Sequence, residues 1–325
     1  MIKLLYIKYF LRKFCEVMYL SFKNIFTQVA VLFIIILVGY FVRKKGLLDE
    51  SSTSKLSSLV MNIFLPAMII TAMQIQFDKD MIPKILSLLF VSMVMFGVST
   101  IVAFCLKIFI KSDSKLGIFQ YALVFSNSGF MGYPVVEAVL GKGAIFYAAI
   151  FNLPFNFLCF TLGVYFLSKG NSNAKFSIKS MINPSMIAVF IGLALFVTGT
   201  ELPVFINHPL ELLGDVTTPI SMIVIGSMLA GSSAMECFKR FDMYMLAILR
   251  LVAIPMLVFL VLRPFSFDSV VMAIPVVIAA MPSAANTAIM ANEYGADVAL
   301  ASQAVFFTTL FSVVSIPLIS VLLLA

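Results

Sequence analysis

The sequence predicts an all-α polytopic membrane protein of ten transmembrane helices, arranged as two five-helix repeats of inverted topology, and three observations support this. Of the 325 residues, 62% are apolar and only 11% are charged, whereas an average soluble domain has roughly 25% charged residues. Apolar runs long enough to cross a bilayer alternate with short polar breaks along the chain. The order of runs and breaks in the first half recurs in the second.

The ten expected spans cover residues 25–42, 58–75, 85–106, 117–140, 144–167, 184–199, 215–231, 242–262, 269–292 and 298–325. Since one span takes about 20 residues, these runs leave no room for a soluble catalytic domain. The longest polar break, residues 168–183, lies near the middle and is predicted to be a cytoplasmic linker. It separates a first repeat, residues 18–167, from a second repeat, residues 184–325.

Residues 1–17 stand apart from this pattern. They carry several basic residues but lack a long apolar core and a small-residue cleavage site, which makes them a poor signal peptide. Two interpretations remain open. Either Met18 is the natural start of the protein, or residues 1–17 form an amphipathic arm on the membrane surface.

An internal repeat links the two halves. An offset of 153 residues aligns Gly39 with Gly192, Gly46 with Gly199, and Pro66 with Pro219. Because each half has an odd number of spans, the second half enters the membrane from the opposite side. Inverted repeats are typical of secondary transporters, whose substrate site lies near the bilayer midplane, although duplication also occurs in membrane proteins that transport nothing.

The net charge of +7 is distributed in short basic clusters between apolar runs, which indicates membrane topology rather than a surface for nucleic acid. Lys and Arg residues are concentrated in the loops after spans one, three, five and seven. This excess marks the cytoplasmic side and places both chain termini outside the plasma membrane. The expected partners are membrane lipids and a small-molecule substrate.

Neither a metal site nor a bound cofactor is expected. The four cysteines have no ligand spacing, and the single histidine, His208, is expected in a loop before Pro209. The sequence has no P-loop motif, so ATP is not expected to drive the protein directly. The coupling ion is left open between H⁺, which needs one carboxylate, and Na⁺, which backbone carbonyls could coordinate.

Polar and helix-breaking residues interrupt spans four and nine at corresponding depths. Such paired interruptions are the best sequence pointer to a transporter site, because unwound backbone at membrane depth is tolerated only inside the protein. The predicted substrate-binding residues are Asn127, Ser128, Gly129, Ser283, Asn286 and Thr287, and the predicted helix-breaking residues are Gly132, Pro134 and Pro282. The alternative is a pair of proline kinks with small residues for close helix packing.

Two charged residues lie within the apolar spans, where ionisable groups are costly and usually functional. Glu137, three residues after Pro134, is a candidate carrier of a coupling proton or an ordinary membrane-surface carboxylate. Arg250, in the middle of span eight, is expected to pair with a carboxylate or to meet an anionic substrate.

A further set of polar residues is predicted to line a secondary cavity. The set comprises Asn62 before Pro66, Thr217 and Thr218 before Pro219, and the i, i+4 pair Asn152 and Asn156 in span five. The alternative role for these residues is hydrogen bonding between helices.

Three stretches of the chain resemble the auxin efflux carrier family, which includes plant PIN-type carriers and bacterial malate permease-like proteins. They are residues 39–48, residues 127–134 and residues 280–295. The resemblance implies broken fourth and ninth helices that cross near the midplane, as in NhaA-type and bile-acid-symporter-type folds. It also implies an elevator-like motion, and homodimers are common in that fold. The second proline of the plant motif is replaced by Thr287 and the long plant loop is missing, so auxin specificity does not carry over.

The predicted function is secondary active transport of small organic anions, with carboxylates such as malate as the substrate class. The site is expected where spans four and nine cross, and no enzymatic activity is expected because the acidic residues are almost all in loops. The alternatives are a membrane sensor or scaffold without flux, and a sodium-coupled symporter of another organic anion.

Overall fold

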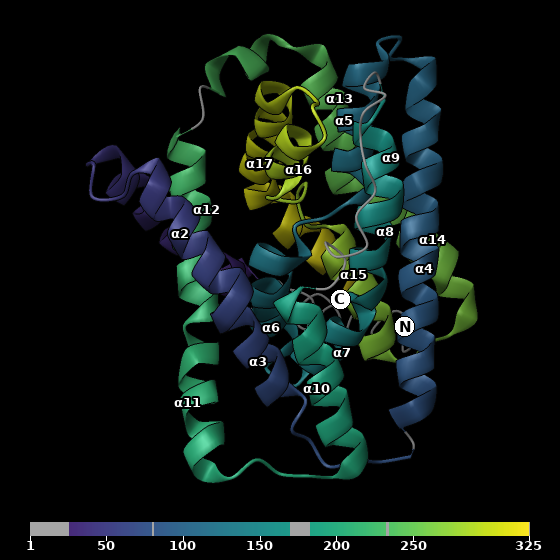
Figure 1. The fold of residues 1–325 in the computed structure, drawn as a ribbon. Helices are drawn as coiled ribbons and strands as arrows, with labels where there is room; N and C mark the ends of the chain where they lie inside the picture. The colour runs from purple at the N-terminus through teal and green to yellow at the C-terminus, as the bar shows by residue number, and fades with distance from the viewer. Residues whose placement is uncertain (1–25, 80, 170–182, 232–233, 325) are drawn as a thin grey trace, which may run out of the picture.

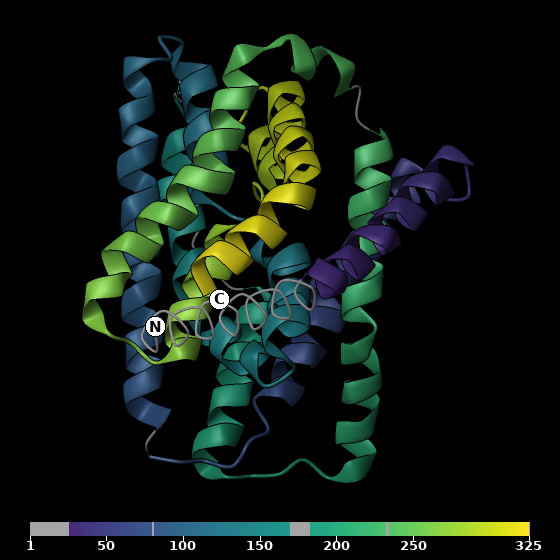
Figure 2. The same ribbon diagram turned by 180° about the vertical axis from the view of Figure 1, so that it is seen from behind.

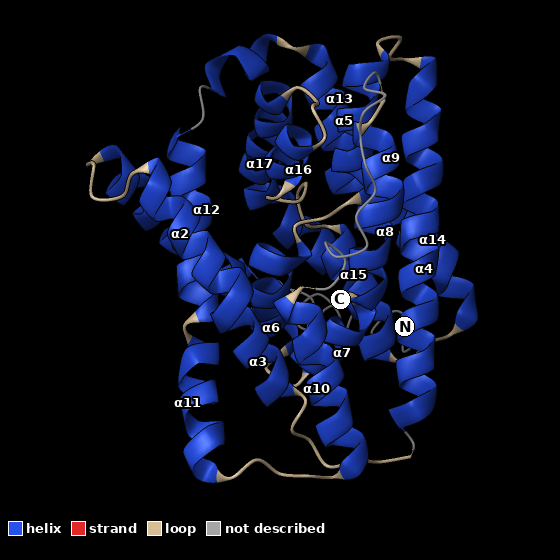
Figure 3. Ribbon diagram, in the orientation of Figure 1, coloured by secondary structure: helices blue, strands red, loops and turns tan. Residues whose placement is uncertain are grey.

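The computed structural model describes residues 26–324 apart from residue 80, residues 170–182 and residues 232–233. The predicted extension 1–17 and most of the predicted linker 168–183 lie outside the described residues. Within the described part the secondary structure is helical, and the one β-type contact is an isolated bridge (Figures 1 and 3). Seven helices are long and apolar enough to span a membrane. The predicted helical membrane protein is therefore confirmed, while the count of ten helices stays a prediction.

The seven long helices are Phe26–Lys44, Glu50–Ala72, Met81–Ile108, Ala144–Leu167, Val204–Gly231, Phe241–Phe265 and Val298–Ser320. Several of them are assembled from consecutive segments, namely α2 (Glu50–Leu59) with α3 (Leu65–Ala72), α7 (Ala144–Phe151) with α8 (Leu153–Leu158) and α9 (Val164–Leu167), α11 (Val204–Asp215) with α12 (Thr217–Gly231), and α13 (Phe241–Ile248) with α14 (Ile254–Leu262). The other elements are α4 (Met81–Cys105), α5 (Asp113–Val124), α6 (Tyr133–Leu140), α10 (Pro184–Thr198), α15 (Ser269–Ala279), α16 (Thr287–Glu293) and α17 (Val298–Leu324).

Two helix starts differ from the predicted spans. The second long helix begins at Glu50 because Asp49 caps it, accepting a 2.7 Å hydrogen bond from the Ser52 backbone N–H. The helix that contains the seventh predicted span begins at Val204, so His208 lies inside α11 and not in a loop. Val204 and Phe205 are strongly exposed apolar side chains, and exposed apolar residues of this kind suit a lipid-facing helix that starts before Pro209.

Three prolines inside the long helical runs each follow a π-helical turn. The turns are Val60–Phe64 before Pro66, Ser128–Gly132 before Pro134, and Leu249–Ala253 before Pro255. Proline lacks an N–H, and its ring collides with the carbonyl four residues earlier in a regular α-helix. That carbonyl is at the centre of the π-turn in all three cases. The wider turn accommodates the ring, so these prolines bend the helix without ending it.

The helices pack as two groups. The first helix group consists of helix Phe26–Lys44, α2–α3, α10 and α11–α12, in which α3 packs on α10 and α11 and α2 packs on α12. The second helix group consists of α4 to α9 and α13 to α17. Among the described elements, the main contacts between the groups are those of α12 with α6 and with the turn Ser128–Gly132, and those of α3 with α7. In Figure 1, α2, α11 and α12 form one edge of the molecule.

Two glycines allow helix Phe26–Lys44 to lie directly against α12 (Figure 2). A Cβ atom at Gly226 would be 1.9 Å from the Ile36 carbonyl oxygen, and one at Gly39 would be 2.3 Å from the Ile223 carbonyl oxygen. Small residues let membrane helices approach closely and gain van der Waals contact. The backbone contact at these two glycines therefore holds helix Phe26–Lys44 against α12.

We expect Gly226→Ala to destabilise the protein by about 1–3 kcal/mol, the usual cost of overpacking a tight contact. The measurement is thermal unfolding of purified protein in detergent. The matched control is Gly97→Ala on α4, where an added Cβ meets open space and alanine improves helix propensity. Equal unfolding temperatures for the two variants would show that the contact is not tight.

Candidate functional site

The two interrupted helices meet at their breaks. The first break, Phe125–Asn127, separates α5 from the π-turn that leads into α6, and the second, residues 280–286, separates α15 from α16. Ser126 and Ser283 form an antiparallel bridge. The Asn127 N–H donates to the Pro282 carbonyl at 2.8 Å, and the Ala284 N–H donates to the Phe125 carbonyl at 2.9 Å. Each unwound segment therefore supplies the hydrogen-bond partners that the other lacks inside the bundle.

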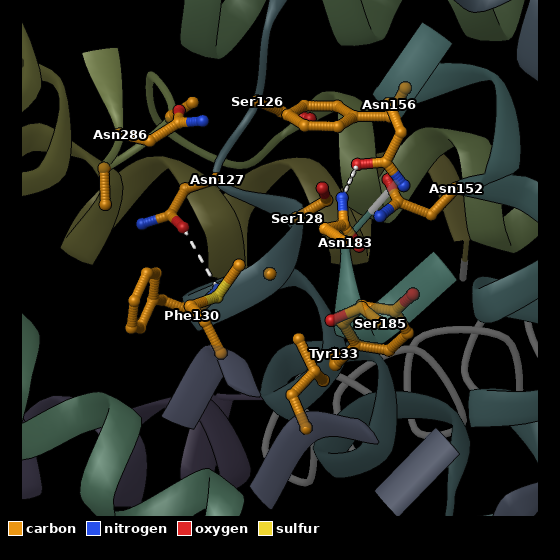
Figure 4. A pocket seen from close by; sticks show the side chains of 16 residues that line it. Ser126, Asn127, Ser128, Phe130, Tyr133, Asn152, Asn156, Asn183, Ser185 and Asn286 are labelled. Atoms are coloured by element: carbon orange, nitrogen blue, oxygen red, sulfur yellow. Dashed lines mark hydrogen bonds between the residues drawn. The ribbon is translucent and has the colours of Figure 1, made fainter. Parts of the chain in front are cut away.

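Two cavities with largely different lining residues reach this crossing. The smaller, which we call the crossing cavity, has a volume of about 60 Å³ (Figure 4). Its lining residues are Met61, Leu65, Ser126, Asn127, Ser128, Gly129, Phe130, Tyr133, Asn152, Phe155, Asn156, Asn183, Ser185, Ala284, Ala285 and Asn286. Met61 and Leu65 belong to the first helix group, and Asn127 and Asn152 belong to the second. The crossing cavity thus lies between the groups.

The larger, which we call the wide cavity, has a volume of about 460 Å³. Residues of the first helix group, among them Arg43, Glu50 and Thr53, line one side, and residues of α16 and α17, among them Asn292 and Thr309, line the other. Asn127 and Ala285 line both cavities. The crossing therefore separates a small cavity from one large enough for a small-molecule ligand, since such sites usually measure roughly 300–1,000 Å³.

Asn127 is placed to contact a ligand. The residue is 3% exposed, and its Oδ1 accepts a 3.3 Å hydrogen bond from the Phe130 N–H, which caps the helical run 128–140. Its side-chain nitrogen donates to no described residue and remains available as a donor (Figure 4). Ser126, on the same break, is 1% exposed, and its hydroxyl has no partner among the described residues. These two groups are polar side chains at the cavity without a full set of partners.

The hydroxyl of Tyr121 contacts the side chain of Asn286. The Tyr121 hydroxyl lies 3.0 Å from the Cys159 sulfur and 3.5 Å from Asn286 Oδ1. Sequence reasoning missed Tyr121, which is buried on α5. A signal was present, because a tyrosine in mid-span needs a partner for its hydroxyl when it is buried.

The other predicted residues divide into those that line the crossing cavity and those that do not. Ser128, Gly129, Asn152 and Asn156 line it. Asn156 accepts a 2.7 Å hydrogen bond from Asn183, the capping residue of α10 (Figure 4). This bond connects the second helix group to the first.

Ser283 and Thr287 are structural in this arrangement and line neither cavity. The Ser283 hydroxyl donates to the Ala122 carbonyl at 3.0 Å, and the Thr287 hydroxyl donates to the Ala284 carbonyl at 2.5 Å. Both residues are fully buried. The Ser283 hydroxyl thereby satisfies a carbonyl at the first break, and the Thr287 hydroxyl shares the Ala284 carbonyl with the Thr287 backbone N–H, which donates to it at 3.0 Å.

Three residues predicted for the secondary cavity also lie outside both cavities. Asn62 is exposed and donates to the Ser58 hydroxyl at 2.9 Å. Thr217 is fully buried with no partner among the described residues for its hydroxyl. Thr218 donates to Glu137 at 2.9 Å. The orientation of their helices about the helix axis points these side chains away from the crossing. The prediction used only the position of each residue relative to a proline, which does not determine that orientation.

The predicted helix-breaking residues differ in their effects. Pro282 lies within the second break, and its carbonyl forms part of the bridge. Gly132 and Pro134 instead lie inside a continuing helix, whose interruption is at Phe125–Asn127. The π-turn before Pro134 explains this difference, because it removes the clash that would end the helix.

Glu137 and its neighbours connect the groups at one end of α6. Glu137 accepts the Thr218 hydrogen bond, and Lys142 forms an ion pair with Asp215 at 2.8 Å. The hydrogen bond from Lys142 to Asp215 raises the pKa of Lys142, so its ammonium group stays charged. Both side chains of this ion pair are mostly exposed, so it contributes little stability alone.

Arg250 is fully buried and lines neither cavity. Its Nε donates to the Met281 carbonyl at 3.0 Å, and its Nη1 donates to the Leu123 carbonyl at 2.9 Å. The predicted carboxylate partner is absent among the described residues, since none forms an ion pair with it. Backbone carbonyls at the two breaks accept the hydrogen bonds of Arg250 instead of a carboxylate.

The amino-acid sequence matches the family described as membrane transport protein over residues 24–176 and 170–320. The chain belongs to this family. The match confirms the resemblance to the auxin efflux carrier family, and it identifies a transporter family and not a family of enzymes.

Relatives with similar sequences are also named as transporters. An uncharacterised transporter of Methanocaldococcus jannaschii is 28% identical over 297 residues, which cover 89% of this chain and 96% of the relative. An uncharacterised transporter of Methanothermobacter thermautotrophicus is 26% identical over 294 residues, 89% of this chain and 95% of the relative. A Rhizobium meliloti protein provisionally named a malonate transporter is 24% identical over 207 residues, 60% of this chain and 63% of the relative.

Proposed function

We propose that this membrane transport protein is a secondary active transporter of small organic anions, with carboxylates such as malate as substrates bound at the crossing of the two broken helices. The observation that carries the proposal is the position of Asn127. It lies on the break, lines both cavities and keeps a free amide donor. A group in this position can contact a ligand that enters from either cavity.

The electrostatics of the crossing favour an anion. The helical run that starts at Ser128 directs the positive end of its dipole toward the crossing cavity. No acidic side chain lines that cavity among the described residues. In the wide cavity, Arg43 and Glu50 are both present and their charges offset each other, so the preference for an anion rests on the crossing cavity. The malonate name of one relative supports a carboxylate substrate.

The arrangement of the groups supports an elevator-type mechanism. Both cavities lie between the first and second helix groups, and the groups touch through few elements. In the proposal, ten helices form two inverted repeats, and the second helix group carries the crossing past the first. The protein resides in the plasma membrane with both termini outside, and a homodimer is compatible with this arrangement. Glu137 is the carboxylate that we assign to proton coupling, because Thr218 ties it to the first group.

The proposal is tested by counterflow in proteoliposomes loaded with unlabelled malate. We expect labelled malate to accumulate transiently and indole-acetate to accumulate far less, because the crossing cavity, with a volume of about 60 Å³, leaves less room for an indole ring than for a small carboxylate. Empty liposomes and protein-free detergent controls set the background. If folded protein moves none of malate, lactate and indole-acetate, the transport proposal fails, and a sensor or scaffold becomes the better explanation.

A further inference from the structure

The side chain of Arg250 contacts both broken helices, near the end of α5 and just after the end of α15. Leu123 lies in the last turn of α5, and Met281 lies two residues after α15 ends. Their carbonyls accept the two hydrogen bonds from Arg250. Arg250 itself lies in the π-turn Leu249–Ala253, which packs against α5 and α17. A single guanidinium group therefore joins the two breaks. Arg250 and Leu123 are 127 residues apart in the sequence.

The charge of this group matches the charge of its surroundings. The carboxyl end of a helix carries a partial negative charge, because its last carbonyls have no helical partner. In transporters with broken helices, such ends and the unwound carbonyls beside them coordinate a sodium ion. Here two such carbonyls accept hydrogen bonds from the N–H groups of Arg250 instead. No described carboxylate forms an ion pair with Arg250.

We propose that Arg250 is a built-in cation that replaces a sodium ion at the crossing, so that substrate binding and transport do not require sodium. Arg250 is a positioning residue: it holds the ends of α5 and α15 together and thereby sets the position of Asn127 and Asn286. A direct contact with substrate is not part of this role, because Arg250 is fully buried and lines neither cavity. The inference about transport rests on the proposed function, whereas the inference about the cation site concerns the folded protein alone.

The test measures thermal unfolding of purified protein without substrate, in sodium chloride and in choline chloride at equal ionic strength. We expect the parent protein to unfold at the same temperature in both salts. Arg250→Met removes the charge and both donors but keeps the apolar volume. We expect it to unfold roughly 5 °C or more below the parent in choline, and to recover part of that loss in sodium, because the vacated carbonyls can then coordinate the ion.

Two further variants keep the test decisive. Arg250→Lys keeps the charge but not the two-donor geometry, and we expect an intermediate unfolding temperature with no sodium dependence. Arg263→Met, at an exposed arginine in the short turn Arg263–Phe265 after α14, controls for loss of charge and should match the parent. If Arg250→Met cannot be purified in folded form, the parent protein and Arg250→Lys still give the sodium comparison.

Several outcomes overturn the inference. Stabilisation of the parent by sodium but not by choline would show that a sodium site exists beside Arg250. An Arg250→Met variant that is as stable as the parent, or that is destabilised but insensitive to sodium, would show that the guanidinium does not occupy a cation site. Because none of these readings uses transport, they remain valid even if no anion moves in the counterflow assay.

Discussion

Asn127→Asp is expected to reduce carboxylate counterflow by about tenfold or more, which corresponds to about 1.4 kcal/mol of lost stabilisation. Aspartate is as good a helix cap as asparagine, so its carboxylate can still accept the hydrogen bond from Phe130. The substitution therefore keeps the helix cap. It removes the free amide donor and places a negative charge where the anionic substrate is proposed to bind, at a residue only 3% exposed.

Asn62→Asp is the matched control, since Asn62 is an exposed asparagine that lines neither cavity. It adds the same charge to the protein, and we expect transport close to that of the parent. Binding of malate, followed by its effect on unfolding temperature, separates loss of binding from loss of motion. Parent-like binding and counterflow in Asn127→Asp would exclude Asn127 as a substrate contact.

The sequence predicted the parts of the site that depend on local chemistry. A cluster of polar, glycine and proline residues in an apolar span costs backbone hydrogen bonds, and both breaks lie in the spans where such clusters occur. Asn127, Ser128 and Gly129 line the crossing cavity, and their binding of substrate stays a prediction. The sequence also predicted that the two breaks meet, but not the bonds that join Asn127 to Pro282 and Ala284 to Phe125, because these bonds depend on tertiary packing.

The type of a residue did not by itself predict whether its side chain faces a cavity or bonds to the backbone. Ser283 and Thr287 carry the same hydroxyls as substrate-binding residues, yet nearby carbonyls already accept their hydrogen bonds. Arg250 was recognised as a costly buried charge, but its partners are carbonyls and not a carboxylate. Carbonyl groups occur at every residue and leave no mark in the sequence. Only the positions of the breaks in space show which of them lack helical partners.

The relative motion of the helix groups can be tested where a direct bond connects them. Asn183 caps the start of α10 in the first helix group, and Asn156 lies on α8 in the second. Their side chains are joined by a 2.7 Å hydrogen bond at the crossing cavity. If transport carries the second group past the first, this bond must break in every cycle. A covalent link at the same place would then hold the protein in one state.

We expect cross-linking of Asn156→Cys with Asn183→Cys, by a short thiol-bridging reagent, to reduce counterflow about tenfold or more, and a reducing agent to restore it. Cys15 and Cys105 are replaced by serine in the parent so that they do not react. The control pair, Lys84→Cys with Asp268→Cys, replaces an ion pair of 3.1 Å that lies entirely within the second helix group. Its cross-link should leave counterflow unchanged, because it joins residues that move together. Equal inhibition in both pairs would indicate a general loss of flexibility, and undiminished transport in the first pair would contradict a sliding motion between the groups.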